Sequence, residues 1–464
     1  MRTSTSAGLQ TTISVLVDSL ISFYTLEPVI LELAERGVRQ HLYCIPKILD
    51  RVTALLPALV ADSIAFIPFA AEQRGKYYLH RLLRQLATRR SFSFQYRLFS
   101  DPHQFPGDWR YWLAAQLARL SPGLPHATVN RALAGIMAPL MSNPFASSRV
   151  LTVSKSVFPH VLCARDLEVM TLLESWDHPV KWPVGHTSSA VFAWNKDLAR
   201  DWAGYQGDAE VHAIYPLKLR YWLERRLPNR EPSRRRVAVY AVGTSSMSYM
   251  NEIHRHELAV IEAVCEATAR SGWRLLIKPK PNGKLGDFDG FTQRYEHVTL
   301  GAYRDAKTPA DYYLDDEYNR QREAELAGGD LVINALTTFG LDAALGGVPC
   351  LQIDLRRCPE FKGAAEAQTN HHLAQYLLGD PALCLVAEPG CLVDQLATFL
   401  RAPDDRAARL RDRLRNWLQP AMPLQQAVGF IADRLLKPAQ QAVSGVSGAA
   451  SNLGVHKPGH DQRT

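Results

Sequence analysis

The sequence predicts an α/β protein built from two Rossmann-like halves. Two strand–helix–strand stretches predict it, one over residues 12–45 and the other from Asp330 to Asp354. In each, a short apolar run typical of a buried parallel strand leads through a polar turn into a helix and a second apolar run. Because such units join neighbouring parallel strands, we expect one parallel sheet in each half.

The first stretch opens with a strand, Thr12–Val17, followed by a polar turn at Asp18 and Ser19. A helix is predicted from Pro28 to Gly37, where glycine ends it, and a second strand follows.

Residues 72–148 are rich in Arg, Tyr, Phe, Trp and Leu and are expected to form a helical insertion. This composition fits amphipathic helices with a basic solvent face, or a surface that contacts an acceptor or a membrane.

Strand patterning returns at Arg149 and gives a strand near residues 168–173, which ends in a run containing Asp177 and His178. Ligands of open α/β sheets collect at the carboxyl ends of the strands, so these two side chains are candidate catalytic groups. The alternative is a strand end whose Trp packs in the core and whose Asp caps a turn. Residues 224–236, rich in proline and arginine, are predicted to link the halves.

The second half begins with a strand over residues 237–242. A later strand delivers Lys278 and Lys280 into a proline-stiffened loop. Two ammonium groups at the carboxyl end of a strand suit a diphosphate, although a solvated loop is the alternative.

The stretch from Asp330 carries the clearest nucleotide-binding pattern. A buried strand at Leu331–Ile333 leads to Thr337 and Thr338, which are placed to cap a helix that contains Gly340 and Asp342. The free N–H groups of a helix start suit a phosphate, and a first-turn carboxylate can accept from a ribose hydroxyl. The plainer alternative is an ordinary cap followed by an ordinary first-turn acid.

The remaining boundaries follow from composition. We expect an N-terminal domain over 1–223, a C-terminal domain over 237–420 with His371 and His372 as donor-side candidates, a terminal helix over 421–437 and a disordered tail over 438–464.

Composition indicates a globular protein, with 47% hydrophobic and 21% charged residues in 464. The net charge of +7 suits an anionic ligand or an anionic membrane surface, but the sequence lacks the dense cluster of basic residues that is typical of a nucleic-acid binder.

The seven cysteines have no metal-ligand spacing, so we expect reduced thiols and no metal. The N-terminus lacks a signal-peptide core and Leu56–Ala71 is too short to span a bilayer, so we expect a cytoplasmic protein.

Several short motifs, taken in order, resemble GT-B glycosyltransferases of the surface-polysaccharide branch that includes CDP-glycerol glycerophosphotransferases. The motifs are Glu174–Asp177, Val191–Asn195, Leu276–Pro281, Asp330–Asn334 and Asp342–Pro349. Lys280 stands where several of those proteins have His, and Asp342 stands where they have Glu. The resemblance implies two Rossmann-like domains facing across a cleft, with the nucleotide held mainly by the C-terminal one and no bound metal or cofactor required.

The expected partners are therefore a nucleotide-sugar donor and a glycan or lipid-linked acceptor, with attachment to the inner face of the membrane as an option. In that role Lys278, Lys280 and the N–H groups after Thr338 would stabilise the leaving diphosphate. Asp177 or His178 would serve as the base, with Asp18 in reserve. Polyol-phosphate transfer, UDP-sugar epimerisation and non-catalytic binding of a nucleotide or glycan are the alternatives.

Overall fold

The computed structural model describes most of the two predicted halves. It covers residues 12–69, 132, 135–136, 143–154, 167–174, 188–206, 209–225, 236–244, 251–280, 284–303, 314–335, 337, 339–369 and 378–437. Several predictions therefore concern segments outside the described residues: most of the 72–148 insertion, most of the linker, Asp177 and His178, Thr338, His371 and His372, and the 438–464 tail.

The N-terminal half is a parallel sheet of seven strands in the order β3-β2-β1-β4-β5-β6-β7. Its strands are β1 Thr12–Val17, β2 Arg39–Cys44, β3 Ile64–Pro68, β4 Arg149–Val153, β5 Glu168–Leu172, β6 Ala190–Ala193 and β7 Glu210–Ala213. The strand order reverses between β1 and β4, which is where ligands bind in open α/β sheets.

The C-terminal half is a parallel sheet of six strands in the order β10-β9-β8-β11-β12-β13. Its strands are β8 Val237–Ala241, β9 Arg274–Lys278, β10 Val298–Leu300, β11 Leu331–Asn334, β12 Cys350–Asp354 and β13 Cys384–Val386. This is the Rossmann strand order, with its reversal between β8 and β11. The prediction of two Rossmann-like domains is confirmed by these strand orders.

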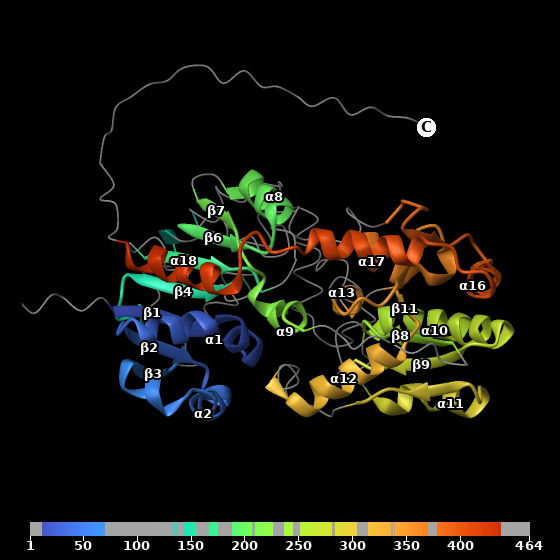
Figure 1. Ribbon diagram of the computed structural model, residues 1–464, viewed down its shortest axis with the longest axis horizontal. Coiled ribbons are helices and arrows are strands. Elements are labelled where there is room, and N and C mark those ends of the chain that lie inside the picture. Colours follow the sequence, from blue (N-terminus) through green and yellow to red (C-terminus); the bar gives the residue numbers. More distant parts are fainter. Residues whose placement is uncertain are drawn as a thin grey trace, which may run out of the picture.

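Helices flank both sheets (Figure 1), which explains why central strands such as β1 and β8 are buried along most of their length. Those of the N-terminal half are α1 Leu20–Glu35, α2 Pro46–Leu55, η1 Ala58–Ser63, α8 Lys196–Gln206, η7 Leu217–Leu219 and α9 Arg220–Leu223. Those that follow are α10 Asn251–Ser271, η8 Leu285–Phe288, α11 Asp289–Arg294, α12 Asp316–Gly328, α13 Phe339–Leu345, η10 Pro359–Phe361, α14 Lys362–Thr369, α16 Leu392–Arg401, α17 Arg406–Trp417 and α18 Leu424–Leu436.

Helix α1 begins at Leu20, eight residues before the predicted start at Pro28. Ser19 caps it, because its hydroxyl accepts from the Ser22 N–H at 3.1 Å. A proline inside a helix leaves the carbonyl four residues earlier without its N–H donor. Here that carbonyl belongs to Tyr24, and the Arg220 guanidinium of α9 donates to it. The helix therefore continues through Pro28, and the lost bond is replaced from α9.

Helix α9 joins the two halves (Figure 1). On one side Arg220 pairs with Glu27 of α1 at 2.6 Å. On the other side the Trp222 ring lies 5.4 Å from the guanidinium of Arg322 on α12. Helix α1 packs on η7, which leads directly into α9, and α9 packs on α13. Since α1 and α13 each start at the carboxyl edge of their own sheet, the η7–α9 segment lies between those two edges.

The C-terminal helix α18 returns to the N-terminal half, where Figure 1 shows it in the same half as β1–β7. Ala427, Ile431 and Leu435 are buried in one cluster with the residues of α1. Arg149 of β4 donates to the Leu435 carbonyl at 2.7 Å. The predicted terminal helix therefore completes the core of the N-terminal half.

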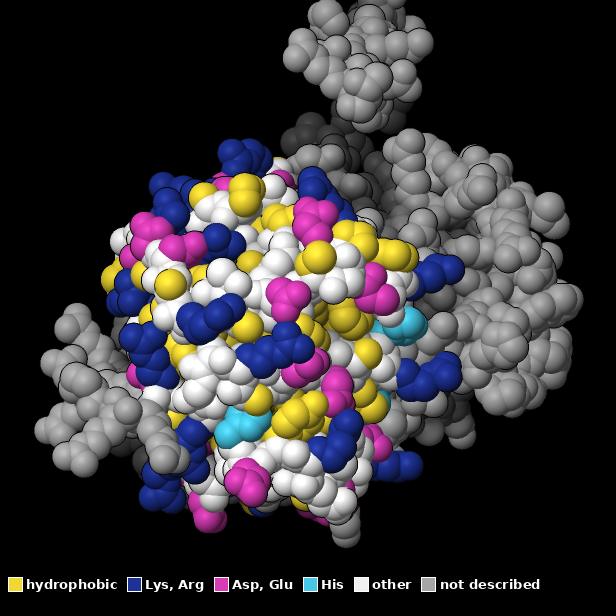
Figure 2. All heavy atoms as spheres, turned by 90° about the vertical axis from the view of Figure 1, so that its right-hand side faces the viewer, with side chains coloured by type: hydrophobic (Ala, Val, Ile, Leu, Met, Phe, Trp, Pro, Cys, Tyr) yellow, Lys and Arg dark blue, Asp and Glu magenta, His cyan; other side chains and the backbone are white. Residues whose placement is uncertain are grey.

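The face in Figure 2 shows basic and acidic side chains interspersed over the end of the C-terminal half. Ion pairs on the surface of this half, such as Arg270 with Glu266 and Arg294 with Glu262, join side chains of opposite charge. Within the described ranges, none of the helices combines the length and apolar character needed to cross a membrane.

Candidate functional site

The turn after β8 lies at the reversal point of the C-terminal sheet. Glu257 of α10 is fully buried and accepts from the N–H groups of Gly243 at 2.7 Å and Thr244 at 2.8 Å. These two N–H groups are already used inside the protein, so a bound phosphate would need other donors.

Lys280 provides such a donor beside the same turn. Its ammonium group donates to the Gly243 carbonyl at 3.1 Å, and the residue is half-buried. The carboxyl ends of β8 and β9 are neighbours, because Ala241 pairs with Lys278. Lys280 therefore lies beside the reversal point between β8 and β11, and its role in donor binding stays a prediction.

Lys278 differs from the prediction. Its side chain is 4% exposed, and its ammonium group pairs with Glu325 of α12 at 2.7 Å and donates to the Ala302 carbonyl at 2.6 Å. Burial lowers the pKa of Lys278, with Glu325 acting in the opposite direction. The prediction that both lysines are free to meet a ligand is therefore wrong for Lys278, whose charge is neutralised inside the protein.

The loop between β11 and α13 is held by its own side chains. Asn334 accepts from the Thr337 N–H at 3.0 Å and donates to the Thr337 carbonyl at 2.8 Å. The Thr337 hydroxyl accepts from the Phe339 N–H at 3.2 Å, so this residue caps α13. A Cβ on Gly340 would lie 3.0 Å from the Asn334 amide nitrogen, so glycine at this position permits close packing.

Asp342 pairs with Arg322 of α12, and the two side chains are 14% and 8% exposed. Burial raises the pKa of Asp342, while the nearby Arg322 lowers it. A ribose hydroxyl would have to share or displace this ion pair. The ribose role of Asp342 therefore stays a prediction.

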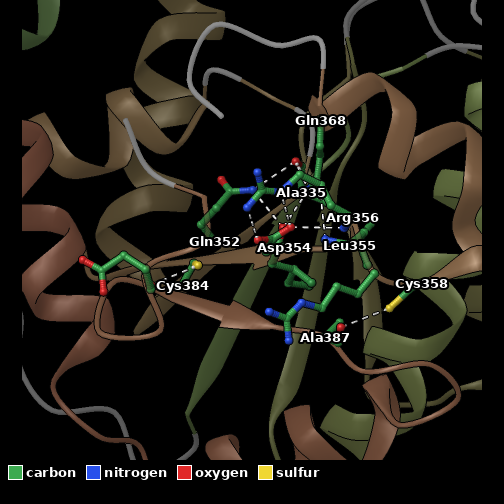
Figure 3. Close-up of polar contacts among 12 residues, drawn as sticks. Ala335, Gln352, Asp354, Leu355, Arg356, Cys358, Gln368, Cys384 and Ala387 are labelled. Atoms are coloured by element: carbon green, nitrogen blue, oxygen red, sulfur yellow. Dashed lines mark hydrogen bonds and ion pairs between the residues drawn. The ribbon is translucent and has the colours of Figure 1, made fainter. Parts of the chain in front are cut away.

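A buried amide network, absent from the sequence predictions, fixes the same loop (Figure 3). Gln352 of β12 and Gln368 of α14 both donate to the Ala335 carbonyl, at 3.0 and 2.8 Å. Gln352 also accepts from Asn334 at 2.9 Å. In the sequence, only a glutamine inside an apolar strand, Gln352, indicated this network. Gln368 lies in a separate helix and comes close to Ala335 only when the chain is folded.

Asp354 and Arg356 form a bidentate pair just beyond the amide network (Figure 3). The guanidinium donates to the two carboxylate oxygens at 2.9 and 2.7 Å. Burial of Asp354 opposes ionisation, but the hydrogen bonds from Arg356 outweigh it and hold the pKa of this carboxyl below its usual range.

The carboxyl edge of the N-terminal sheet carries carboxyl groups. The Ser22 hydroxyl contacts Asp18 at 2.7 Å and the fully buried Glu174 at 3.3 Å. Asp18 follows β1 and Glu174 follows β5, so the fold brings together residues 156 positions apart (174 − 18). Sequence reasoning selected Asp18 but missed Glu174, which appeared only as the first residue of a motif.

Among the residues that the structure describes, no three His, Cys, Asp or Glu side chains gather in a way that could hold a metal ion.

No protein family model and no curated protein matches this sequence. Similar solved structures include the glycotransferase of kitacinnamycin, with 13% identity, a TM-score of 0.45 and coverage of 92% of this chain and 100% of that chain. UGT89C1 of Arabidopsis thaliana has 11% identity and a TM-score of 0.47, covering 91% and 99%. MurG of Acinetobacter baumannii has 10% identity and a TM-score of 0.45, covering 92% and 100%. The strand orders of the two parallel sheets define the fold of this chain.

Proposed function

We propose that the protein is a glycosyltransferase that moves a sugar from a nucleotide-sugar donor to a glycan or lipid-linked acceptor. One observation carries the proposal. A single chain holds two Rossmann-type sheets whose reversal points carry opposite chemistry: an ammonium group, Lys280, in the C-terminal half and carboxyl groups, Asp18 and Glu174, in the N-terminal half. Transfer of a sugar needs both, because the leaving diphosphate gains negative charge and the acceptor hydroxyl loses a proton.

On the donor side, Lys280 would meet the diphosphate. Its ammonium group is oriented by the Gly243 carbonyl at the turn after β8, and its positive charge suits a phosphate oxygen bound beside that turn. The neighbouring loop is fixed at Ala335 by two buried glutamines, so a nucleotide would meet a preorganised surface.

On the acceptor side, Asp18 would act as the base. Its carboxylate is half-buried at the carboxyl end of β1 and accepts from Ser22, and an ionised carboxylate is the kind of group that accepts the proton of a substrate hydroxyl. Asp177 and His178 stay candidates for the same role.

The cellular setting proposed here is surface-polysaccharide synthesis at the inner face of the membrane. It is supported by the motif resemblance and by the net charge of +7, which suits an anionic surface carrying a lipid-linked acceptor.

The experiment is a thermal-shift screen of nucleotides and nucleotide sugars, followed by product analysis with and without acceptor. A ligand that binds the native state raises the melting temperature by mass action. Sugar transfer releases a nucleoside diphosphate, or CMP from a CMP-activated sugar, together with a glycosylated acceptor. Release of CMP from CDP-glycerol would indicate polyol-phosphate transfer, a changed sugar without transfer would indicate epimerisation, and binding without turnover would indicate a non-catalytic protein.

A further inference from the structure

Arg322 of α12 carries a guanidinium group that is buried inside the protein. Three aromatic rings lie near it, with centroids 5.4 Å (Trp222 of α9), 5.7 Å (Phe339 of α13) and 6.0 Å (Tyr318 of α12) from the guanidinium carbon. A buried guanidinium is stabilised by aromatic rings and by a carboxylate partner. Here that partner is Asp342 of α13.

Stability alone does not account for an ion pair at this place. Two buried charges lose their hydration, and replacing such a pair with apolar side chains of similar volume is often neutral or stabilising. The aromatic surroundings of Arg322 would suit an apolar side chain as well. The charge of Arg322 therefore points to a role at the carboxyl group that it holds.

Asp342 is held through one of its two carboxyl oxygens. The Arg322 guanidinium donates to Oδ2, and no other residue that the structure describes donates to this carboxyl group. The side chain is half-buried, so part of it faces solvent. The second oxygen, Oδ1, is itself a hydrogen-bond acceptor. The pair with Arg322 thus fixes the carboxyl group and leaves Oδ1 for a hydroxyl group of a ligand.

Asp342 lies at the edge of the sheet where the donor would bring its ribose. It belongs to the first turn of α13, which follows β11, and β11 pairs with β8 at the reversal point beside Lys280. In a nucleoside diphosphate the ribose is bonded directly to the diphosphate. We propose that Arg322 is a positioning residue for the donor, which holds Oδ2 of Asp342 so that Oδ1 accepts from a ribose hydroxyl. This inference rests on the proposed function, because it needs a nucleotide at Lys280.

The segment that joins the two halves takes part in this positioning. Trp222, which lies over the Arg322 guanidinium, follows two residues after Arg220, and Arg220 ties α9 to α1. Burial raises the pKa of Asp342, and Arg322 and Lys218 both oppose this rise, which indicates that η7 also lies close to the carboxyl group. The N-terminal half therefore contributes to the ribose site through the contact of Trp222 with Arg322.

The test compares a ribonucleotide with its analogues that lack the 2′- or the 3′-hydroxyl. Calorimetry with the nucleoside diphosphate that gives the largest thermal shift, and with these analogues, measures the affinities. We expect wild-type protein to bind the ribonucleotide roughly tenfold more tightly than one of the analogues, as for a lost hydrogen bond that leaves a polar partner unpaired. Arg322→Met should bring this ratio close to one. Arg322→Lys keeps the charge without the planar fork and should give an intermediate ratio.

The ratio separates positioning from a structural role, because general loosening of the site weakens the binding of both ligands alike. Arg320→Met removes an exposed arginine from the same helix and should leave the ratio unchanged. Trp222→Leu should lower it, since α9 then no longer covers Arg322 with a ring. Wild-type protein that binds both analogues as tightly as the ribonucleotide would overturn the inference. So would a wild-type ratio in Arg322→Lys, which decides the matter if Arg322→Met does not fold.

Failure of the proposed function gives a different result. Nucleotide binding with the expected ratios, but without sugar transfer to any acceptor, would mean that the transfer reaction is wrong and that the positioning role stands. Sugar transfer with a ratio that does not respond to Arg322 would mean that the positioning role is wrong and that the proposed function stands. If no nucleotide binds wild-type protein, both are wrong.

Discussion

At the residue scale, the proposed chemistry depends on Lys280. If its ammonium group meets the leaving diphosphate, its contribution grows as negative charge develops, so it appears in turnover more than in donor binding. We expect Lys280→Ala to lower kcat by about 100-fold, as for the loss of one oxyanion donor, with a smaller change in donor KM. Steady-state kinetics with the identified donor test this. Lys284→Ala, which removes an exposed ammonium group nearby, is the control.

Lys280→His adds a second comparison, because it introduces the residue that the motif resemblance would lead us to expect at this position. Partial recovery of turnover relative to Lys280→Ala would support a positive charge or a proton donor at this position. Turnover in Lys280→Ala equal to that of wild type would mean that the anion site lies elsewhere.

Lys278 should behave as a structural residue. Breaking a buried ion pair from one side leaves an uncompensated charge and costs about 3–5 kcal/mol, whereas replacing both partners with apolar groups costs less. We therefore expect Lys278→Met to destabilise the protein by that amount and addition of Glu325→Leu to restore part of it. Urea unfolding of the two single variants and the double variant measures the coupling. Additive effects of the two substitutions would contradict the buried pair.

Asp354 makes a pH-dependent prediction. Its folded-state pKa is depressed, so its contribution to stability is present above its unfolded pKa and is lost as the pH falls through the folded value. Arg356→Met removes the hydrogen bonds that depress it. The difference in unfolding free energy between wild type and this variant should therefore be largest near neutral pH and shrink below about pH 4, the ordinary pKa of an aspartate. A difference that stays constant down to pH 2 would rule out this linkage.

At the scale of elements, α18 belongs to the N-terminal half. Ile431 is fully buried against that core, so Ile431→Ala should cost about 2–5 kcal/mol, whereas the exposed Gln425→Ala should cost little. Hydrogen exchange should then rise in α1 and β4 before it rises in α10. Faster exchange confined to the C-terminal half would show that α18 is not part of this core.

Local patterns predicted some elements closely. The strand at Thr12–Val17 matches β1, and the helix predicted to contain Gly340 and Asp342 is α13, because apolar periodicity and caps are properties of neighbouring residues. The start of α1 was missed, because Pro28 normally breaks a helix and its compensation comes from Arg220, nearly two hundred residues away. Glu325 as the partner of Lys278, and Gln368 as the support of Ala335, were missed for the same reason.

At the scale of the whole molecule, the net charge of +7 predicts salt-sensitive attachment to anionic lipid. Flotation with anionic and neutral vesicles, at low and at high salt, measures this attachment. We expect binding to anionic vesicles only, and we expect high salt to abolish it. If no such binding is found, the prediction of membrane attachment is wrong.

The central claim is that a nucleotide diphosphate binds at the reversal point of the C-terminal sheet, facing the carboxyl groups of the N-terminal half. A crystal structure of the protein with the tightest-binding nucleoside diphosphate tests it most directly. The account predicts a phosphate oxygen within hydrogen-bond distance of the Lys280 ammonium group, at the carboxyl ends of β8, β9 and β11. A nucleotide bound at the N-terminal sheet, or one that leaves Lys280 without a phosphate contact, would contradict it.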